Sequence, residues 1–212
     1  MFDTLNEKIN AKTCIIGVLG LGRVGLPLAS VLASNDVRVI GIDVNHSRVD
    51  LINKGICPFH DPLLQENLKI SINSGYLSTV SSLSDCNETP DIIFVTVGTP
   101  NSNDNSVDYS QLYSALEDIG NLDLKNKMII MRSTLPPKTA EDIVIPFLEQ
   151  KTKLKAGFDF ALAVCPERIL EGHAVKELKE LPEIIGGINL DSNNIATNIF
   201  KIINPDKEFS YT

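Results

Sequence analysis

Apolar and polar residues alternate along this chain in blocks of two kinds. Short, nearly continuous apolar runs rich in β-branched residues are typical of strands that are buried on both faces. Longer stretches with one apolar face are typical of amphipathic helices. Strands are predicted for residues 14–20, 37–43, 91–100, 128–134, 160–166 and 181–187. Helices are predicted for residues 24–34, 47–53, 62–73, 110–119, about 139–150 and 192–203.

The order of these blocks indicates the fold class. Strands that alternate with helices predict βαβ units, and therefore an α/β fold with a doubly wound, mainly parallel sheet and helices on both faces. Residues 1–12 are polar, and we expect a short, loosely held lead-in there. Residues 13–212 then form one domain. The segment 101–108 is rich in Asn, Ser and Asp and predicts a loop, after which Ser110 is a candidate helix N-cap.

Composition narrows the class of protein. The chain has 212 residues, of which 43% are hydrophobic and 22% charged, as in ordinary soluble globular proteins. Its net charge of −8 and isoelectric point near 4.9 argue against a nucleic-acid partner, because such proteins usually carry a basic stripe. No apolar run reaches the ~18 residues of a membrane span, and the first residues lack the apolar core of a secretory signal. We therefore expect a cytoplasmic protein without a membrane partner.

The spacing of the four cysteines does not match that of a structural zinc site. Cys14, Cys57, Cys86 and Cys165 lie far apart, with no CxxC pair. Structural zinc sites usually take their ligands from closely spaced pairs, so no metal site is predicted. Free thiols are expected, as in a reducing cytoplasm.

A glycine motif follows the first predicted strand. Gly20, Gly22 and Gly25 form the pattern GxGxxG at the start of the next predicted helix. Gly20 would permit a tight turn, Gly22 would let a pyrophosphate approach the backbone, and Gly25 would let the helix pack closely on the sheet. The N–H groups at the helix start would then hold the phosphate charge. A plain glycine turn is the alternative, but the motif lies between a strand and a helix, as a Rossmann-like dinucleotide fold requires.

An acid and a base follow the second predicted strand. Asp43 ends that strand, at about the distance from the last glycine that a dinucleotide fold requires. Its carboxylate would accept hydrogen bonds from the adenosine ribose and repel a 2′-phosphate, which favours NAD over NADP. Arg48 could stack on the adenine or reach the ribose, or it could be a solvated surface residue.

Three further strand ends carry polar groups. Thr99 and Thr134 follow strands whose carboxyl ends form a ligand rim in an open α/β sheet, although each hydroxyl could instead cap a local turn. Glu167 could position a water or act as a base, and Arg168 could bind a phosphate or a neighbouring chain. A surface ion pair at a helix start is the alternative for these two.

These motifs together resemble a known family. GLGRVGLPLA from residue 20, Asp43 with Arg48 after it, VGTP at 97–100, STLPPKT at 133–139 and PERILEG at 166–172 occur in the order found in the UDP-glucose/GDP-mannose dehydrogenases, which are nucleotide-sugar 6-dehydrogenases. The segment from residue 166 to 187 looks most like the UDP-N-acetylmannosamine branch. The resemblance covers nearly the whole chain.

The resemblance implies an activity and roles for individual residues. Members of the family oxidise a sugar C6 alcohol to a carboxylate with two NAD, through a thioester on a cysteine. By resemblance, the pyrophosphate would lie on Gly20, Gly22, Arg23, Val24 and Gly25, the adenosine on Asp43 and Arg48, and the nicotinamide near Thr99 and Thr134. Glu167 would match the active-site glutamate of the water and thioester steps, and Arg168 and Ile169 would meet the nucleotide-sugar substrate.

The chain also departs from the family. Family members are longer, and their lysine, asparagine and nucleophilic cysteine lie beyond the point at which this sequence ends. Cys165 precedes the Pro-Glu motif and is not that cysteine, and residues 60–62 stand where the family usually has Glu-Pro-Gly. We therefore expect a chain that binds NAD without turnover by itself, while the full-length member is expected to be a homo-oligomer.

Two alternatives to this reading stay open. The chain could serve an enzyme acting on UDP-glucose or GDP-mannose rather than on a UDP-N-acetylhexosamine. It could also be a stand-alone, non-catalytic dinucleotide-binding module.

Overall fold

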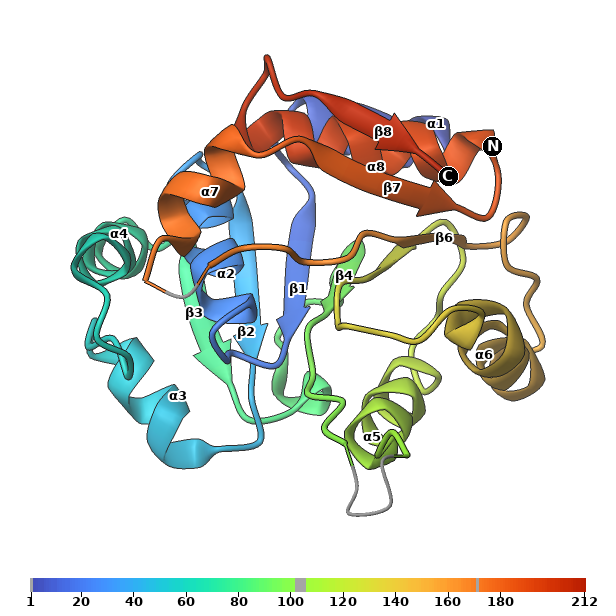
Figure 1. Ribbon diagram of the computed structural model, residues 1–212, viewed down its shortest axis with the longest axis horizontal. Helices are drawn as coiled ribbons and strands as arrows, with labels where there is room; N and C mark the ends of the chain where they lie inside the picture. Colours follow the sequence, from blue (N-terminus) through green and yellow to red (C-terminus); the bar gives the residue numbers. More distant parts are fainter. Residues whose placement is uncertain (1, 102–105, 171) are drawn as a thin grey trace.

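The centre of the protein is an eight-stranded sheet with the order β3-β2-β1-β4-β5-β6-β7-β8 (Figure 1). The computed structural model describes residues 2–101, 106–170 and 172–212. The strands are β1 Ile15–Leu19, β2 Arg38–Ile42, β3 Leu77–Val80, β4 Ile92–Val95, β5 Met128–Met131, β6 Ala161–Val164, β7 Glu183–Gly187 and β8 Phe209–Tyr211. The first six are parallel, β7 pairs antiparallel with β6, and β8 pairs parallel with β7. The predicted doubly wound, mainly parallel sheet is confirmed.

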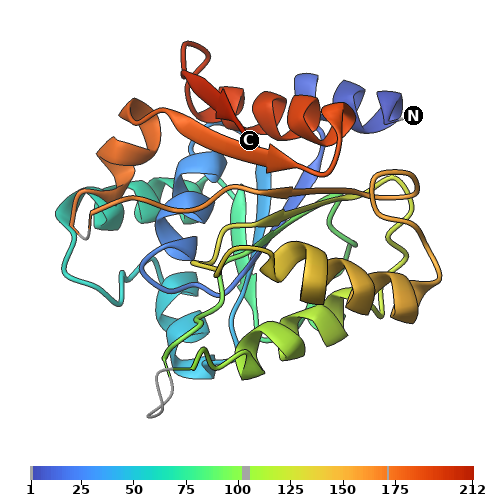
Figure 2. The ribbon, with the colours of Figure 1, turned by 45° about the vertical axis from the view of Figure 1, so that its right-hand side comes forward.

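Helices cover both faces of this sheet. They are α1 Asp3–Asn10, α2 Gly25–Ala33, α3 His46–Asn53, α4 Pro62–Asn73, α5 Ser110–Ile119, α6 Ile145–Thr152, α7 Ala174–Glu180 and α8 Leu190–Ile203. A π-helical turn, Ala140–Val144, leads into α6, and a short 3-10 turn, Leu83–Asp85, precedes β4. Figure 2 shows α5 and α6 side by side on the face opposite to α2 and α8.

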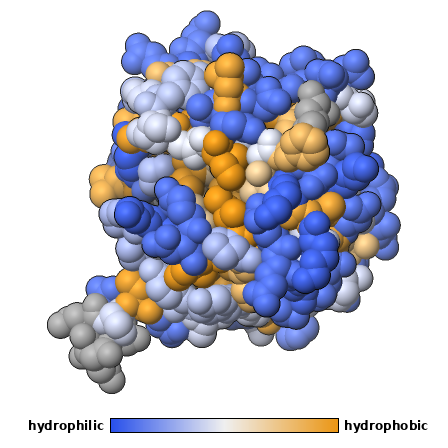
Figure 3. Space-filling model, turned by 90° about the vertical axis from the view of Figure 1, so that its right-hand side faces the viewer, coloured by the Kyte–Doolittle hydropathy of each residue, from blue (hydrophilic) through white to orange (hydrophobic). Residues whose placement is uncertain are grey.

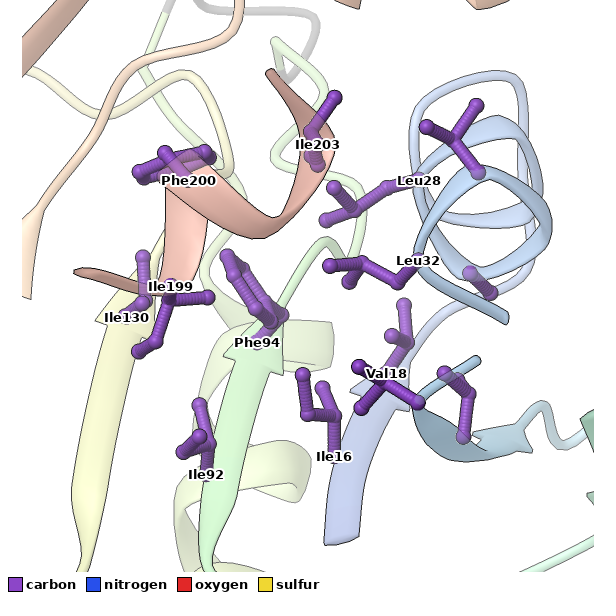
Figure 4. Packing of buried hydrophobic residues seen from close by; sticks show 14 of the residues in the cluster. Ile16, Val18, Leu28, Leu32, Ile92, Phe94, Ile130, Ile199, Phe200 and Ile203 are labelled. Carbon is purple, nitrogen blue, oxygen red and sulfur yellow. The ribbon is translucent and has the colours of Figure 1, made fainter. Parts of the chain in front are cut away.

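Successive residues of the central strands enter different cores, because side chains alternate across a strand. In β4, Ile92 and Phe94 belong to the core beneath α2 and α8, whereas Ile93 and Val95 belong to the core beneath α5 and α6. Figure 4 shows the first core, where Phe94 lies between the side chains of α2 and α8, and its ring meets that of Phe200 edge to face at 5.9 Å. Burial on both faces explains why these strands appear as continuous apolar runs in the sequence.

The expected loose lead-in is wrong. Residues 3–10 form α1, which packs on α8, and Phe2, Leu5 and Ile9 are 2–3% exposed within the main core. These three apolar residues recur at helical spacing in an otherwise polar segment, so one narrow stripe is enough to dock the helix. Nothing in the structure tests a domain boundary at residue 12, which stays a prediction.

Several elements were not expected from the sequence. β3 contains Ser78 and Thr79 and lacks a long apolar run, because it lies at the edge of the sheet beside β2 alone. β8 has three residues, and α7 is only seven residues long. Ser110 is not the N-cap of α5, since it is the first helical residue and its N–H donates to the Asp108 carboxylate at 2.8 Å. Of the predicted loop, residues 102–105 lie outside the described residues, and Asn101 pairs with Val107 in an isolated bridge.

Candidate functional site

The turn between β1 and α2 depends on its glycines. Gly20 has a φ of +93°, which favours glycine, and its N–H donates to the Ile42 carbonyl at 2.8 Å. A Cβ on Gly25 would lie 1.9 Å from the Gly20 carbonyl oxygen, so a side chain cannot fit there. A Cβ on Gly22 would meet nothing within 4 Å. The turn is therefore closed toward the protein and open toward solvent.

Thr96, which the sequence analysis did not single out, fixes this turn to β4. Its hydroxyl donates to the Gly20 carbonyl at 2.6 Å and lies 2.8 Å from the Leu19 carbonyl. The strand order reverses between β1 and β4, and ligands of open α/β sheets bind at such a point. The available signal in the sequence was a hydroxyl residue inside the strand predicted over residues 91–100.

Asp43 lies beside the turn with its carboxylate engaged from three directions. Oδ2 accepts from the Leu21 N–H at 2.8 Å and from Arg48 Nη1 at 2.7 Å, and Oδ1 accepts from the Asn45 N–H at 2.9 Å. The carboxylate is nearly buried, and the Arg48 side chain is 30% exposed. Arg48 is therefore paired rather than freely solvated, and the pair lies at the carboxyl end of β2.

The pyrophosphate of a dinucleotide fits this turn. Gly22 leaves space for it, and α2 begins directly after the turn. In the first turn of α2 the N–H groups of Leu26 and Leu28 donate to the Gly22 and Val24 carbonyls, and Pro27 has no N–H. Val24 at the N-cap makes no side-chain capping hydrogen bond. Arg23 directs its guanidinium over the Phe59 ring, at 5.1 Å from the centroid. The positive end of the α2 dipole thus faces an open space suited to an anion.

A cleft of about 450 Å³ continues from this turn across the ends of β4 and β5. Val24 lines it on one side, and Thr99 and Thr134 line it on the other. The Thr99 hydroxyl donates to the Thr134 carbonyl at 2.6 Å, which joins two loops that are far apart in the sequence. The structure thus brings the two predicted threonines together beside the glycine turn.

Glu167 belongs to a buried cluster of charges. Its Oε2 accepts from Arg132 Nε at 2.6 Å, and its Oε1 accepts from the N–H groups of Arg168 and Ile169 at 2.7 and 3.0 Å. The Glu167 side chain is 7% exposed and that of Arg132 is 2% exposed. The alternative of a surface ion pair with Arg168 is wrong, because the partner is Arg132, at the carboxyl end of β5.

The two remaining predicted site residues lie around this cluster. Arg168 is exposed, and its guanidinium donates to the Pro182 carbonyl. Ile169 is half-buried and packs against the main core. Sequence reasoning did not single out the side chains of Arg132, Glu183 and Lys207, which are buried nearby. The predicted strand over residues 128–134 included Arg132, but no role was assigned to its side chain. A charged residue inside an apolar run was the signal that this side chain needed a buried partner.

A second hollow, of about 350 Å³, lies beside β6 and β7. Its lining includes Leu135, Ile145, Leu162, Val164 and Ile188. Figure 3 looks onto this side of the molecule and shows a band of apolar atoms bordered by hydrophilic ones.

The cysteines are poor nucleophiles. Burial, with the charge of Asp91 as a second cause, raises the pKa of the Cys14 thiol to about 11. Burial also raises the pKa of Cys57, Cys86 and Cys165. Since the thiolate is the reactive form, none of these residues is suited to covalent catalysis at neutral pH.

A membrane-spanning segment and a metal centre are two other classes of site. Within residues 2–101, 106–170 and 172–212, no helix combines the length and the apolar character needed to cross a membrane. The same residues contain no group of three or more potential metal ligands in a suitable arrangement.

Strand order, glycine turn and strand-end acid together define a dinucleotide-binding domain of the Rossmann type. The NAD-binding domain profile of the UDP-glucose/GDP-mannose dehydrogenase family matches residues 14–204, and the chain belongs to this family as an NAD-binding domain. The family resemblance of the sequence motifs is thus confirmed.

Individual relatives and solved structures agree with this assignment. The chain is 34% identical to a UDP-N-acetyl-D-mannosamine dehydrogenase of Campylobacter jejuni over 90% of its length and 47% of the relative's. It is 32% identical to a GDP-mannose 6-dehydrogenase of Pseudomonas syringae pv. syringae over 88% of its length and 43% of the relative's. A UDP-N-acetylmannosamine dehydrogenase structure from Pyrococcus horikoshii superposes with a TM-score of 0.88 at 31% identity, covering 93% of this chain and 46% of that one. The chain spans about half the length of these relatives.

Proposed function

We propose that this chain is the cofactor-binding half of an NAD-dependent enzyme that oxidises the C6 alcohol of a nucleotide-sugar to a carboxylate. The observation that carries the proposal is the glycine turn, closed against Thr96 and open at Gly22, with Asp43 hydrogen-bonded to its edge. A bound NAD supplies an acceptor for hydride. Because the conversion of an alcohol to an acid removes two hydrides, two NAD are consumed.

The residues of the turn hold the cofactor in this proposal. Gly20, Gly22 and Gly25 shape the turn, while Arg23 and Val24 contribute backbone N–H groups to the pyrophosphate. The helix dipole of α2 stabilises the negative charge there.

The acid–arginine pair at the end of β2 binds the adenosine side. Asp43 accepts hydrogen bonds from the ribose, and Arg48 keeps the carboxylate oriented while it contacts the adenosine. The same carboxylate repels a 2′-phosphate, so NAD is preferred over NADP. Thr99 and Thr134, joined by their hydrogen bond, line the cleft where the nicotinamide lies.

The substrate side is assigned to the loop after β6. The carboxylate of Glu167 holds and activates a water for hydrolysis of the oxidised substrate, as a positioned general base would do. Arg168 and Ile169 contact the nucleotide-sugar. Burial raises the pKa of all four thiols of this chain, which disfavours each of them as the nucleophile of the thioester step. We therefore expect that step to depend on a residue other than these four.

UDP-N-acetylmannosamine is the proposed substrate. The segment from residue 166 to 187 and the 34% identity to the Campylobacter jejuni relative support it. The 32% identity to a GDP-mannose 6-dehydrogenase favours GDP-mannose as the second candidate. An NADH-production assay of the whole protein with UDP-N-acetylmannosamine, GDP-mannose and UDP-glucose distinguishes them, and a higher kcat/KM for either of the last two contradicts the proposed sugar.

Calorimetric titration with NAD and NADP tests the cofactor assignment. We expect the unsubstituted chain to bind NAD more tightly, and Asp43→Asn to lose affinity for NAD by about tenfold, the equivalent of roughly 1.4 kcal/mol. Asn keeps the shape and one acceptor oxygen, so the loss reports the charge and the second acceptor. Asp50→Asn removes an exposed charge on the neighbouring α3 and serves as the matched control.

Equal affinity of the unsubstituted chain for NAD and NADP contradicts the role of Asp43. Substantial NADH production by the 212-residue chain alone with UDP-N-acetylmannosamine contradicts its assignment as a half enzyme. NAD binding by the whole protein without turnover of any nucleotide-sugar favours a non-catalytic binding module.

A further inference from the structure

The Arg132 side chain donates four hydrogen bonds inside the protein. Nε donates to Glu167 Oε2 at 2.6 Å. Nη1 donates to Glu183 Oε1 at 2.9 Å and to the Cys165 carbonyl at 3.3 Å. Nη2 lies 3.4 Å from Glu183 Oε2 and 2.5 Å from Glu167 Oε2. These are four hydrogen bonds and one further ion-pair contact, on a guanidinium that carries five N–H groups.

This arrangement leaves at most one N–H of Arg132, on Nη2, without a hydrogen bond inside the protein. The guanidinium is also stacked over the Phe200 ring of α8, 5.0 Å from its centroid, and its side chain is 2% exposed. An arginine that binds a phosphate presents its planar fork to the ligand. Arg132 presents its fork to two carboxylates of its own chain, so its influence on the site passes through them.

Glu183 anchors the arginine from the far side. It is the first residue of β7, is 3% exposed, and meets both terminal nitrogens of the guanidinium. Two carboxylates face one guanidinium, and the Lys207 ammonium lies buried nearby on the carbonyls of Leu178 and Leu181. The orientation of Arg132 is therefore held from the side of β7 as well as by Glu167 and the Cys165 carbonyl.

The Glu167 carboxylate is held in one plane by this anchor. One oxygen is bound to Arg132, and the other is bound to the N–H groups of Arg168 and Ile169. Neither interaction alone fixes the rotation of the carboxylate about its terminal bond, but the two together do. Lysine would be a weaker substitute, because its ammonium can donate to both carboxylates but lacks the planar fork that fixes their orientation.

We propose that Arg132 is a positioning residue that fixes the carboxylate of Glu167, with Glu183 as its anchor on β7. The orientation of the carboxylate is a property of this chain, and its consequence for a substrate rests on the proposed function. The residue acts on the reaction only through Glu167.

Nuclear magnetic resonance of the ¹⁵N-labelled chain measures the orientation directly. The amide signals of Arg168 and Ile169 report the hydrogen bonds to Glu167 Oε1, and Glu167→Ala gives their positions when that acceptor is lost. We expect Arg132→Lys to move both signals most of the way toward those positions, although it keeps the charge. Arg38→Lys is the matched control, because Arg38 forms an exposed bidentate pair with Glu88 and should leave both signals in place.

Unchanged signals in Arg132→Lys would overturn the proposal, since charge alone would then orient Glu167. If that variant does not fold, Glu183→Gln keeps Arg132 and Glu167 and weakens only the anchor. It should shift both signals in the same direction by a smaller amount, and unmoved signals there overturn the proposal as well.

A double-variant cycle in the whole protein tests the route of action. Arg132→Lys should lower kcat with little change in KM for the nucleotide-sugar, and it should cost no further activity in a Glu167→Gln background. Full additivity of the two losses would overturn the assignment of Arg132 as acting through Glu167. NAD titration of the unsubstituted chain is independent of both tests, so a failure to bind NAD would count against the proposed function alone.

Discussion

Two acid–arginine pairs lie at the carboxyl ends of the parallel strands. They differ in the sequence separation of their members and in the exposure of the arginine side chain. Asp43 and Arg48 are five residues apart, at 2.7 Å, and the arginine side chain is 30% exposed. Glu167 and Arg132 are 35 residues apart, at 2.6 Å, and the arginine side chain is 2% exposed. The first pair forms within one β-α corner. The second requires β5, β6 and β7 to lie side by side.

The difference separates a pair that can change partners from one that cannot. Water reaches Arg48, so its bond to Asp43 can lengthen when a ligand enters at little cost. Arg132 is almost fully buried, and a change of partner would leave buried charge uncompensated. We infer that the Asp43 region adapts to its ligand, whereas the Glu167 region is preorganised.

Removal of the two arginines should give the largest contrast. Arg132→Met leaves two buried carboxylates without their cation, and we expect a loss of about 3–5 kcal/mol in the free energy of unfolding. Arg48→Met breaks a partly exposed pair and should cost at most about 1 kcal/mol. Urea unfolding followed by circular dichroism measures both.

Equal losses for these two variants would break the comparison. A loss of less than about 1 kcal/mol from Arg132→Met is in the range measured for exposed ion pairs. Such a result would show that the buried cluster relaxes or admits water.

Two glycines of the turn between β1 and α2, beside Asp43, should differ in their effects on stability and on NAD affinity. Gly25→Ala puts a methyl group against the Gly20 carbonyl, where a Cβ would lie at 1.9 Å, and we expect a loss of about 1–3 kcal/mol in stability. Gly22→Ala meets nothing within 4 Å and should change stability by no more than about 0.5 kcal/mol. The same variant should weaken NAD binding, because its methyl group occupies the space of the ligand.

Thermal unfolding and calorimetric NAD titration of both glycine variants provide the measurement. Unchanged NAD affinity in Gly22→Ala would contradict the assignment of this turn to the cofactor, since the substitution acts only on the open side.

The smallest expected effect is the pH dependence of the unfolding free energy that Lys207, in the Glu167 region, contributes. Burial lowers the pKa of Lys207 in the folded protein below its usual range. The unfolded chain therefore binds more protons between the lowered and the usual pKa, and the contribution of this residue to stability rises with pH through that window. The difference in unfolding free energy between the unsubstituted chain and Lys207→Met should increase as the pH rises toward the usual lysine pKa of 10.5, and a flat difference would contradict a lowered pKa.

Prediction from the sequence succeeded where an element is specified locally. The predicted limits of α4 are those observed, because Asp61 caps the helix and Pro62 occupies its first position. β4 was expected over residues 91–100 but ends at Val95, since Thr96 leaves the strand to bond the glycine turn. α1 was missed because a stripe of three apolar residues is weak without knowledge of the surface it meets.

The sequence by itself determined the alternation of the central strands and helices, the glycine turn and the position of Asp43. These features depend on residues close together in the chain, so that spacing and backbone conformation are enough to specify them.

Only the tertiary structure decided the partners of Glu167. Arg132, Glu183 and Lys207 lie on separate strands and loops, and their burial follows from a sheet order in which β7 turns antiparallel beside β6. A charge inside an apolar run signals that a partner must exist, because an unpaired buried charge is too costly. Which residue provides that partner is settled by packing between segments 35 and 51 residues apart, which local patterns do not encode.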